Sequence, residues 1–201
     1  MARIKKPTLW IFSIEPLDSR YTGQWHKYLP EYLDEKIGEE FKVIQVDGIQ
    51  KNTKITPGAF LNFADTNYWK SSQLCAFLTR YNNGEVSEND HFLFTDAWNS
   101  TIIQIKYMKE LLNYKWKIHG LWHAGNYDNF DFLGRIPEPT KWAQLAELSY
   151  FHSIDHNYFA TKFHIDMFSE NRLDMSAVRS NAMYGDKIGR SGLTMEYLSE
   201  I

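Results

Sequence analysis

Three clusters of polar and aromatic side chains, each directly after a short apolar run, are the parts of this sequence that could do chemistry. In open parallel sheets, ligands bind beyond the carboxyl ends of the strands, where loops carry polar groups on a rigid base. We therefore expect the three clusters to converge on one binding site. Their members are Glu15, Arg20, Tyr21, Thr22, Gln24 and Trp25 in the first, Asp96, Trp98 and Asn99 in the second, and His123, Asn126, Tyr127, Asp128 and Asp131 in the third.

Asp96 is the first candidate for proton transfer. It follows the apolar run Phe92–Thr95 and precedes an amphipathic segment, and a carboxylate at such a place can serve as a general base. Asp is also a preferred N-cap residue at the start of a helix. The spacing alone favours the cap, and both interpretations stay open at this point.

His123 is the second candidate, because it closes an apolar run immediately before a polar loop. A neutral imidazole there can exchange protons near pH 7 or donate to a phosphate or a hydroxyl, whereas a structural histidine would bond to a loop carbonyl. Arg20 could bind a phosphate or carboxylate as a fork, although a lone arginine is more often solvated. Trp25 and Trp98 could stack on a sugar or a base, although most aromatic residues belong to the core.

Metal and nucleotide-cofactor chemistry lack a complete motif. The pair Asp128 and Asp131 has a spacing that defines no ligand set, and ordinary loop capping explains one or both. His152, His156 and His164 lie close together in the sequence, but no Glu or Cys completes a zinc set. The sequence also lacks a Gly-x4-Gly-Lys-Ser/Thr loop and a Gly-x-Gly-x2-Gly turn. We expect no resident metal or cofactor.

The composition fits one globular domain. The chain has 201 residues, of which 43% are hydrophobic, with 7 Trp, 12 Tyr and 13 Phe. This apolar area offsets the entropy of ordering and argues against a disordered chain. The net charge of −3 argues against a dedicated basic nucleic-acid clamp, although it does not exclude a local patch.

The cysteine content and the absence of long apolar runs predict a cellular location. Cys75 is the single cysteine, which excludes a disulfide framework and favours a reducing cytoplasm. No apolar run approaches the roughly 18 residues of a membrane span, and the first residues lack the pattern of a signal peptide. We expect a soluble cytoplasmic protein with no membrane contact.

Apolar runs that alternate with longer amphipathic segments predict the elements that position the three clusters. This alternation is typical of an α/β domain with a buried, mostly parallel sheet flanked by helices. We expect strands over Thr8–Ile14, Phe41–Val46, His91–Thr95, Lys117–Trp122, Tyr150–Ile154 and Lys187–Gly189. We expect helices over Trp25–Ile37 with a kink or a start at Pro30, over Tyr68–Tyr81, after Asn99, over Thr140–Leu148 and Asn157–Phe168, and as a last turn at Met195–Ile201.

The spacing of apolar residues predicts which helix faces are buried. The segment Ile49–Asn67 should be rich in turns, and Asn82-Asn83-Gly84 has the pattern of a helix C-cap. Cys75 should be a core residue. The inward residues should be Leu74, Phe77, Leu78 and Tyr81 in the second helix, Ile102, Ile105, Tyr107, Met108, Leu111 and Leu112 in the third, and Trp142, Leu145 and Leu148 in the fourth.

Five motifs, in order along the chain, resemble the N-terminal half of the phage-type GT-B glycosyltransferases, a family that includes enzymes thought to glycosylate modified phage DNA. No single motif is diagnostic, so the resemblance depends on their order over about Trp10 to Leu198. The motifs are Arg20-Tyr-Thr-Gly-Gln-Trp25, Phe94-Thr-Asp-Ala-Trp98, Ile105-Lys-Tyr-Met108, His119-Gly-Leu-Trp-His-Ala-Gly-Asn-Tyr-Asp128 and Phe159-Ala-Thr-Lys-Phe-His164.

The resemblance implies a single Rossmann-like domain over residues 1–201, which is one half of a two-domain GT-B architecture. In that family the C-terminal domain mainly holds the nucleotide-sugar, and the N-terminal domain mainly holds the acceptor. Residues Ser191–Leu198 look like the family's passage between the two domains. The resemblance therefore implies that the donor-binding domain is absent from this chain. The chain would then be one subunit of a split enzyme whose partner supplies that domain, a truncated gene product, or a piece prepared from a longer protein. The resemblance further implies a nucleotide-sugar co-substrate and no catalytic metal.

The resemblance also implies roles for individual residues. Asp96 matches the family's Thr-Asp-Ala-Trp position and His123 its Trp-His-Ala-Gly position, which makes both catalytic candidates. One would be the base, the other a contact to acceptor or phosphate, and which one takes the proton stays open. Hydroxymethylated phage DNA would be the acceptor. The implied substrate-binding residues are Arg20, Thr22, Gln24, Trp25, Trp98, Asn126, Tyr127 and Asp128.

Two other functions stay open. A non-catalytic binding or adaptor subunit could retain the fold without the donor domain. A hydrolase that uses His123 and Asp128 ranks lowest, because neither a nucleophile nor a complete metal set accompanies them.

Overall fold

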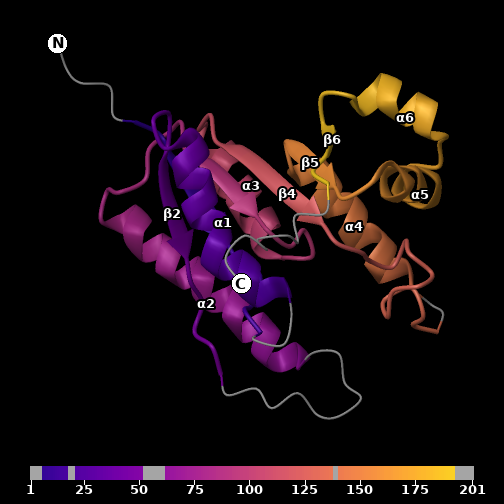
Figure 1. The fold of residues 1–201 in the computed structure, drawn as a ribbon, viewed down its shortest axis with the longest axis horizontal. Coiled ribbons are helices and arrows are strands. Elements are labelled where there is room, and N and C mark those ends of the chain that lie inside the picture. The colour runs from indigo at the N-terminus through magenta and orange to yellow at the C-terminus, as the bar shows by residue number, and fades with distance from the viewer. Residues whose placement is uncertain (1–5, 18–20, 52–61, 138–139, 193–201) are drawn as a thin grey trace.

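A six-stranded parallel sheet organises the chain (Figure 1). The computed structural model describes residues 6–17, 21–51, 62–137 and 140–192. The strands are β1 Thr8–Phe12, β2 Lys42–Val46, β3 His91–Phe94, β4 Lys117–Trp122, β5 His156–Phe159 and β6 Ile188–Arg190. The helices are α1 Tyr21–Ile37, α2 Phe63–Asn82, α3 Thr101–Leu112, α4 Lys141–Ser153, α5 Lys162–Arg172 and α6 Ala177–Tyr184. The predicted fold class, an α/β domain with a parallel sheet flanked by helices, is confirmed.

The order of the strands creates a switch point next to β1. The order is β2-β1-β3-β4-β5-β6, so the chain first moves from β1 to β2 on one side and then returns past β1 to β3 on the other. The connections that leave β1 and β3 therefore run in opposite directions at the carboxyl ends of these two strands. A switch point of this kind leaves a crevice, which is the usual place of a ligand site in an open α/β sheet.

Aromatic side chains fill the layer between the centre of the sheet and α2. β1 pairs with β2 on one side and with β3 on the other, and each of its residues is buried. Phe12 packs on Phe77, Phe92 and Phe94, with ring centroids 5.8, 6.3 and 4.8 Å apart. Aromatic rings of this kind bury much apolar area and pack in offset or tilted arrangements, so the strand that ends at the switch point has a rigid base.

The helices cover the two faces of the sheet unequally. Right-handed crossovers place α1 on one face and the helices that follow β2, β3 and β4 on the other, where α2, α3, α4 and α5 pack side by side. On β3, β4 and β5, the residues under these helices are buried, and the alternate residues are only half-buried. The second face of these strands is therefore less covered by the part of the chain that the structure describes.

A row of three histidines lies on this less covered face. The rings of His91, His119 and His156 stack across β3, β4 and β5, with centroids 5.3 and 5.0 Å apart. His91 Nδ1 lies 3.2 Å from His119 Nε2, within hydrogen-bond distance. Burial, together with the neighbouring His91 and His156, lowers the pKa of His119 to about 4. His119 is therefore neutral near pH 7.

Most of the predicted strands are confirmed, with small differences at their ends. The strand β4 has the predicted bounds Lys117–Trp122, whereas β1 ends at Phe12 rather than at Ile14. The helix α1 starts ahead of Trp25, and Pro30 lies inside it rather than at its start.

The second helix is longer than predicted. The segment Ile49–Asn67 is not all turn, because α2 begins within it. Asn62 caps α2, and its side chain accepts hydrogen bonds from the backbone of Ala64 and Asp65. Gly84 has a φ of +74°, which agrees with the predicted C-cap, since glycine adopts this left-handed conformation at no steric cost. Residues 52–61 of this segment lie outside the described residues.

The prediction was wrong between Tyr150 and Phe168. The predicted strand Tyr150–Ile154 is mostly the last part of α4, and the predicted helix Asn157–Phe168 begins with β5 before α5 starts. The short strand β5 contains a buried Asn157, whose side chain bonds to the indole of Trp122 and to the carbonyl of Phe151. A polar residue inside a four-residue strand hides its apolar pattern. The helix α6 was not predicted, and Met195–Ile201 lies outside the described residues.

The buried face of α4 also differs from the prediction. Trp142 and Leu145 are 56% and 52% exposed, and Leu148 is only half-buried. The buried residues of this helix are Ala143, Glu147 and Phe151. Because a charged residue occupies the middle of the inward face, the spacing of apolar residues indicated the wrong side.

Four further helix positions need correction. Cys75, expected in the core, is exposed, because α2 buries Trp69, Gln73 and Phe77 instead. Tyr107, Leu111 and Leu112 of α3 were expected on the inward side and are 65%, 69% and 37% exposed. Ile102 and Ile105 of α3 are fully buried, as predicted, and Leu74, Leu78 and Tyr81 of α2 are partly buried against the core.

Asp90 joins β1 to the turn before β3, far from the carboxyl ends of the strands. It is fully buried, and its carboxylate accepts hydrogen bonds from the backbone N–H of Thr8, the indole of Trp10, and the backbone and hydroxyl of Ser87. Asp90→Ala leaves these donors buried and unpaired, so we expect the free energy of unfolding in urea to fall by about 3 kcal/mol. The exposed Glu88→Ala is the control and should change it by less than about 0.5 kcal/mol. Equal values for the two variants would contradict the prediction.

His119 should make the protein less stable in mild acid. Its pKa is about 4 in the folded chain and 6.5 in the reference state, so the unfolded chain binds more protons in this range. Stability therefore falls as the pH falls from 6.5 to 4, by at most about 1.4 kcal/mol per pH unit from this residue. We expect the unfolding free energy of His119→Phe to depend less on pH over this window. A difference between wild type and variant that stays constant from pH 7 to pH 4 would contradict this.

Candidate functional site

A cavity of about 590 Å³ opens at the switch point, beyond the carboxyl ends of β1, β3 and β4. Aromatic and apolar side chains form most of its wall, and a few polar groups face it. The aromatic residues are Tyr21, Phe63, Trp98, Phe132, Trp142 and Tyr150, and the charged or titratable ones are Glu15, Lys70, Asp96, His123 and Asp131. The size and the small number of polar groups are typical of a small-molecule pocket.

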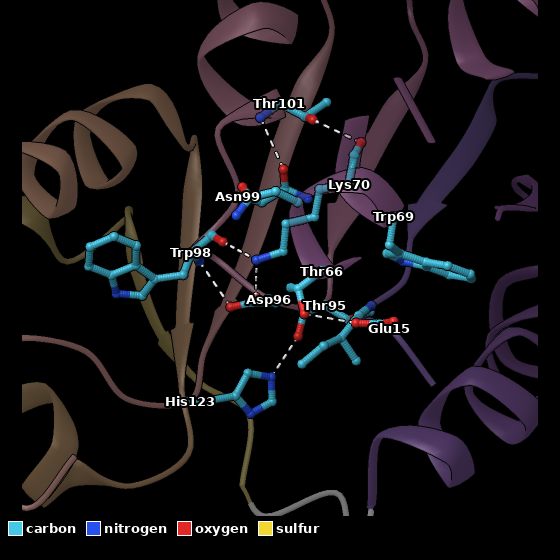
Figure 2. Close-up of polar contacts among 12 residues, drawn as sticks. Glu15, Thr66, Trp69, Lys70, Thr95, Asp96, Trp98, Asn99, Thr101 and His123 are labelled. Atoms are coloured by element: carbon cyan, nitrogen blue, oxygen red, sulfur yellow. Dashed lines mark hydrogen bonds and ion pairs between the residues drawn. The ribbon is translucent and has the colours of Figure 1, made fainter. Parts of the chain in front are cut away.

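Asp96 is held by an ion pair with Lys70 of α2 (Figure 2). Lys70 Nζ donates to Asp96 Oδ2 at 2.7 Å and also bonds to the carbonyl of Trp98. Asp96 Oδ1 accepts the backbone N–H of Trp98 at 3.0 Å. The side chains of Lys70 and Asp96 are 12% and 18% exposed, so water screens this pair less than a surface pair. The ammonium and the amide together fix the orientation of the Asp96 side chain.

Asp96 does not cap the helix that follows it. The helix α3 starts at Thr101, and the residue in the N-cap position is Ser100. Asn99 accepts the backbone N–H of Thr101 through its side-chain oxygen. The cap interpretation of Asp96 is therefore wrong. Its hydrogen bond to Trp98 instead closes a local turn that leaves the carboxylate at the cavity wall.

His123 joins the end of β3 to the start of α1. Its Nε2 lies 2.6 Å from the carbonyl oxygen of Thr95 (Figure 2). A carbonyl only accepts, so Nε2 carries the hydrogen and Nδ1 keeps its lone pair. Nδ1 then accepts the hydroxyl of Tyr21, at 3.1 Å. The imidazole also packs against the ring of Trp25, with centroids 4.9 Å apart. His123 can therefore take a proton only through Nδ1, on the side of Tyr21.

Glu15 supplies a second carboxylate to the cavity wall. It is 4% exposed, and its Oε2 accepts the hydroxyl of Thr66 at 2.8 Å. Its Oε1 is buried without a hydrogen-bond partner among the described residues. A buried carboxylate oxygen left unpaired is costly, so this oxygen is suited to accept a hydrogen bond from a ligand or a water.

Asp131 is the third carboxyl group at the wall. Burial raises its pKa, and backbone hydrogen bonds from Leu133 and Phe132 oppose that rise. Its Oδ1 accepts the N–H of Leu133, and in the same way Asp128 Oδ1 accepts the N–H of Phe130. Both aspartates therefore cap turns of the loop after β4, which is the interpretation that their spacing favoured.

The structure brings some of the predicted site residues together and separates others. Asp96, Trp98, His123 and Thr22 line the cavity. The hydroxyl of Thr22 accepts the N–H of Leu17 and thereby fixes the loop after β1.

The remaining predicted substrate-binding residues that the structure describes do not line the cavity. Trp25 packs behind His123, Gln24 is exposed on α1, and Arg20 lies outside the described residues. Asn126 and Tyr127 are buried, and their side chains face inward. Asn126 bonds to the carbonyl of Leu133, and the Tyr127 hydroxyl lies 2.5 Å from His164 Nε2.

Burial lowers the pKa of His164 to about 4 and raises the pKa of Tyr127 well above its ordinary value. Tyr127 is therefore the donor and neutral His164 the acceptor in this hydrogen bond. The pair lies in the aromatic core, where Tyr127 also contacts Trp122 and Phe168. We conclude that this part of the third cluster supports the loop from behind.

Lys70 and the aromatic wall are the parts of the site that sequence reasoning missed. Lys70 belongs to a helix before β3, and nothing in its local pattern separates it from a solvated lysine. The rings of Phe63 and Phe132 have centroids 5.7 Å apart. Phe63 lies in the first turn of α2, and Phe132 lies in the loop after β4. Only the fold shows that these segments face each other.

Within the described residues, no group of three or more His, Cys, Asp or Glu side chains is arranged to hold a metal ion. The same residues include no helix with the length and apolar character needed to cross a membrane. The sequence matches no protein-family model and no curated protein in the comparisons made.

The Lys70–Asp96 pair should show strong energetic coupling. Lys70→Met and Asp96→Asn should each lower the free energy of unfolding by about 2 kcal/mol, because each leaves a shielded partner unpaired. The double variant should lose less than the sum, with a coupling energy of about 1–2 kcal/mol in a urea denaturation cycle. The exposed pair Lys106–Glu110 is the matched control, with an expected coupling below about 0.5 kcal/mol. Additive losses at Lys70 and Asp96 would show that the pair does not form.

Proposed function

We propose that this chain is the acceptor-side part of a GT-B glycosyltransferase, which transfers a sugar from a nucleotide-sugar to an acceptor hydroxyl. The main support is that Asp96 and His123, the two residues that match catalytic positions of that family, line one cavity at the switch point of the sheet. The fold alone would not support this function, because one α/β fold hosts many activities.

In this proposal Asp96 is the general base. Its carboxylate accepts the proton of the acceptor hydroxyl as the acceptor oxygen forms a bond to the anomeric carbon. The bond between that carbon and the leaving diphosphate breaks, and the diphosphate keeps the electron pair. Lys70 and the backbone N–H of Trp98 donate hydrogen bonds to the carboxyl group of Asp96 and fix its orientation. The base is therefore positioned before the acceptor arrives.

His123 and Tyr21 orient the acceptor in the same proposal. The carbonyl of Thr95 fixes the tautomer of His123, and Nδ1 in turn fixes the hydroxyl of Tyr21 at the cavity wall. A phenol held in this way keeps oxygen lone pairs for a hydroxyl donor. Asp96 lies two residues after the end of β3, His123 follows β4 directly, and these strands are neighbours in the sheet. Both groups can therefore address one ligand.

The chemistry of the wall supports a neutral, hydroxyl-bearing acceptor ring. Aromatic side chains offer stacking surfaces for a sugar or a base, and Glu15 and Asp96 offer hydrogen-bond acceptors. Among the described lining residues Lys70 is the single lysine or arginine, against three carboxyl groups. This charge does not favour a diphosphate. It supports the proposal that a second subunit supplies the donor-binding domain.

Hydroxymethylated phage DNA is the acceptor that we propose. Its extruded base would present a neutral ring and a hydroxyl to the cavity, while its phosphates stay outside. The net charge of −3 limits extended contact with a duplex, because phosphate neutralisation supplies most non-specific affinity.

The test is a transfer assay with a panel of nucleotide-sugars and DNA that contains 5-hydroxymethylcytosine. The chain is coexpressed with the product of the neighbouring reading frame, and any complex is isolated by size exclusion. We expect transfer by the complex, and we expect Asp96→Asn to reduce kcat about 100-fold or more, since it removes the base.

Asp34→Asn on the exposed side of α1 is the matched control and should leave transfer unchanged. Full activity of Asp96→Asn would refute the role of Asp96. Binding of hydroxymethylated DNA without transfer from any donor would instead support the non-catalytic adaptor.

A further inference from the structure

Two walls of the cavity meet behind it at one buried carboxylate, that of Glu147 in α4. One wall is Trp98, which follows β3, and the other is the loop that runs from His123 through Asn126 after β4. Glu147 is 0% exposed and is absent from the lining of the cavity itself. It therefore can influence a ligand only through the groups that it holds.

Glu147 holds both walls with one carboxylate oxygen. Its Oε1 accepts the indole N–H of Trp98 at 3.2 Å and the backbone N–H of Asn126 at 2.5 Å. The first bond fixes the plane of an aromatic ring at the cavity wall. The second fixes the backbone of the loop three residues after His123.

Arg172, at the end of α5, occupies the other oxygen. Its guanidinium bonds to Glu147 Oε2 and to the side-chain oxygen of Asn126, and the Arg172 side chain is 6% exposed. Burial raises the pKa of Glu147, and the hydrogen bonds from Arg172, Asn126 and Trp98 oppose that rise. The guanidinium has a planar fork that suits such bidentate contacts, and it connects α5 to both walls.

Gly125 is the residue that lets the loop approach Glu147 so closely. A Cβ at this position would collide with Glu147 Oε1, with Trp98 Nε1 and with the ring of Tyr127. Glycine is thus required here for close approach rather than for an unusual φ. The loop, the indole and the carboxylate are packed with no room for a methyl group.

We infer that Glu147 is a positioning residue, which sets the distance between the Trp98 wall and the His123 loop and so aligns Asp96 and His123 on one ligand. This inference rests on the proposed function for its effect on transfer, and on geometry alone for its effect on Trp98. Stability alone does not explain why Glu147 and Arg172 form a buried ion pair, since apolar residues of similar volume often replace such a pair with no loss of stability. Apolar residues in place of Glu147 could not accept hydrogen bonds from an indole and a loop amide together.

The experiment compares Glu147→Ala, Glu147→Gln and Gly125→Ala with the control Glu170→Gln, an exposed carboxylate on α5. The first readout is the ¹H–¹⁵N spectrum of the tryptophan indoles. Trp10, Trp69, Trp116 and Trp122 donate to Asp90, Ser13, Ser87 and Asn157, and these four signals show whether each variant is folded. The second readout is kcat and KM in the transfer assay.

We expect Glu147→Ala and Gly125→Ala to move the Trp98 signal while the signals of Trp10, Trp69, Trp116 and Trp122 stay in place. Both variants should lower kcat about 10-fold or more, with a smaller change in KM. Glu147→Gln keeps one acceptor oxygen for Trp98 and Asn126 but places its NH2 group against Arg172, so the Trp98 signal and kcat should change less than in Glu147→Ala. Glu170→Gln should change neither readout. The Gly125→Ala variant keeps every charge, so it tests the packing even if Glu147→Ala does not fold.

An unmoved Trp98 signal in folded Glu147→Ala or Gly125→Ala would overturn the inference. A moved signal with wild-type kcat would also overturn it, because the walls would then shift without consequence. If wild type transfers no sugar to any acceptor, the proposed function fails, and the indole spectra alone decide whether Glu147 positions Trp98.

Discussion

The parallel pairing of β1 with both β2 and β3 is the constraint on which the site depends. All residues of β1 are buried, and its aromatic residues Trp10 and Phe12 pack against Phe77 of α2. Because the chain must return past β1 to reach β3, the connections after these two strands diverge. Every candidate catalytic residue lies at the crevice that this divergence leaves at the switch point. Asp96 follows β3 and His123 follows β4, while Glu15 follows β1 and Lys70 reaches in from the helix between β2 and β3. The topology therefore brings together residues that lie far apart along the chain.

Buried charges fix the geometry at both ends of this sheet. Asp90 anchors the amino ends of β1 and the turn before β3, and Glu147 anchors the loops at the carboxyl ends. A buried carboxylate is tolerated only when donors satisfy its oxygens, and each of these two receives backbone and indole donors. Removing the N–H donors of either carboxylate costs stability, and displacing these donors changes the position of a loop. The stability of the fold and the shape of the cavity thus depend on the same kind of contact.

The sequence predicted the sheet better than the helix faces, and particular residues explain why. The strand Lys117–Trp122 was predicted with its correct bounds, because its apolar residues Ile118, Leu121 and Trp122 stand between polar segments on both sides. The strand His156–Phe159 was missed, because Asn157 is buried through hydrogen bonds that local spacing does not reveal. The inward face of α4 was misassigned for the same reason, since Glu147 is buried through Arg172, which follows 25 residues later. Asp96 and His123 were identified because they follow apolar runs directly. Lys70 was not, because its role depends on the packing of α2 beside β3.

The charge of the cavity restricts which ligands it can hold. Glu15, Asp96 and Asp131 line it, and Lys70, the single lysine or arginine among the described lining residues, already pairs with Asp96. At an effective dielectric constant near 20, two like charges about 5 Å apart repel by about 3 kcal/mol. A diphosphate inside the cavity would meet this repulsion from each ionised carboxylate, whereas a neutral ring with a hydroxyl would meet none. In the glycosyl transfer that we propose, the donor would place its diphosphate outside the cavity, against cations of the proposed second subunit. The cavity would receive the acceptor and, at most, the sugar that is transferred.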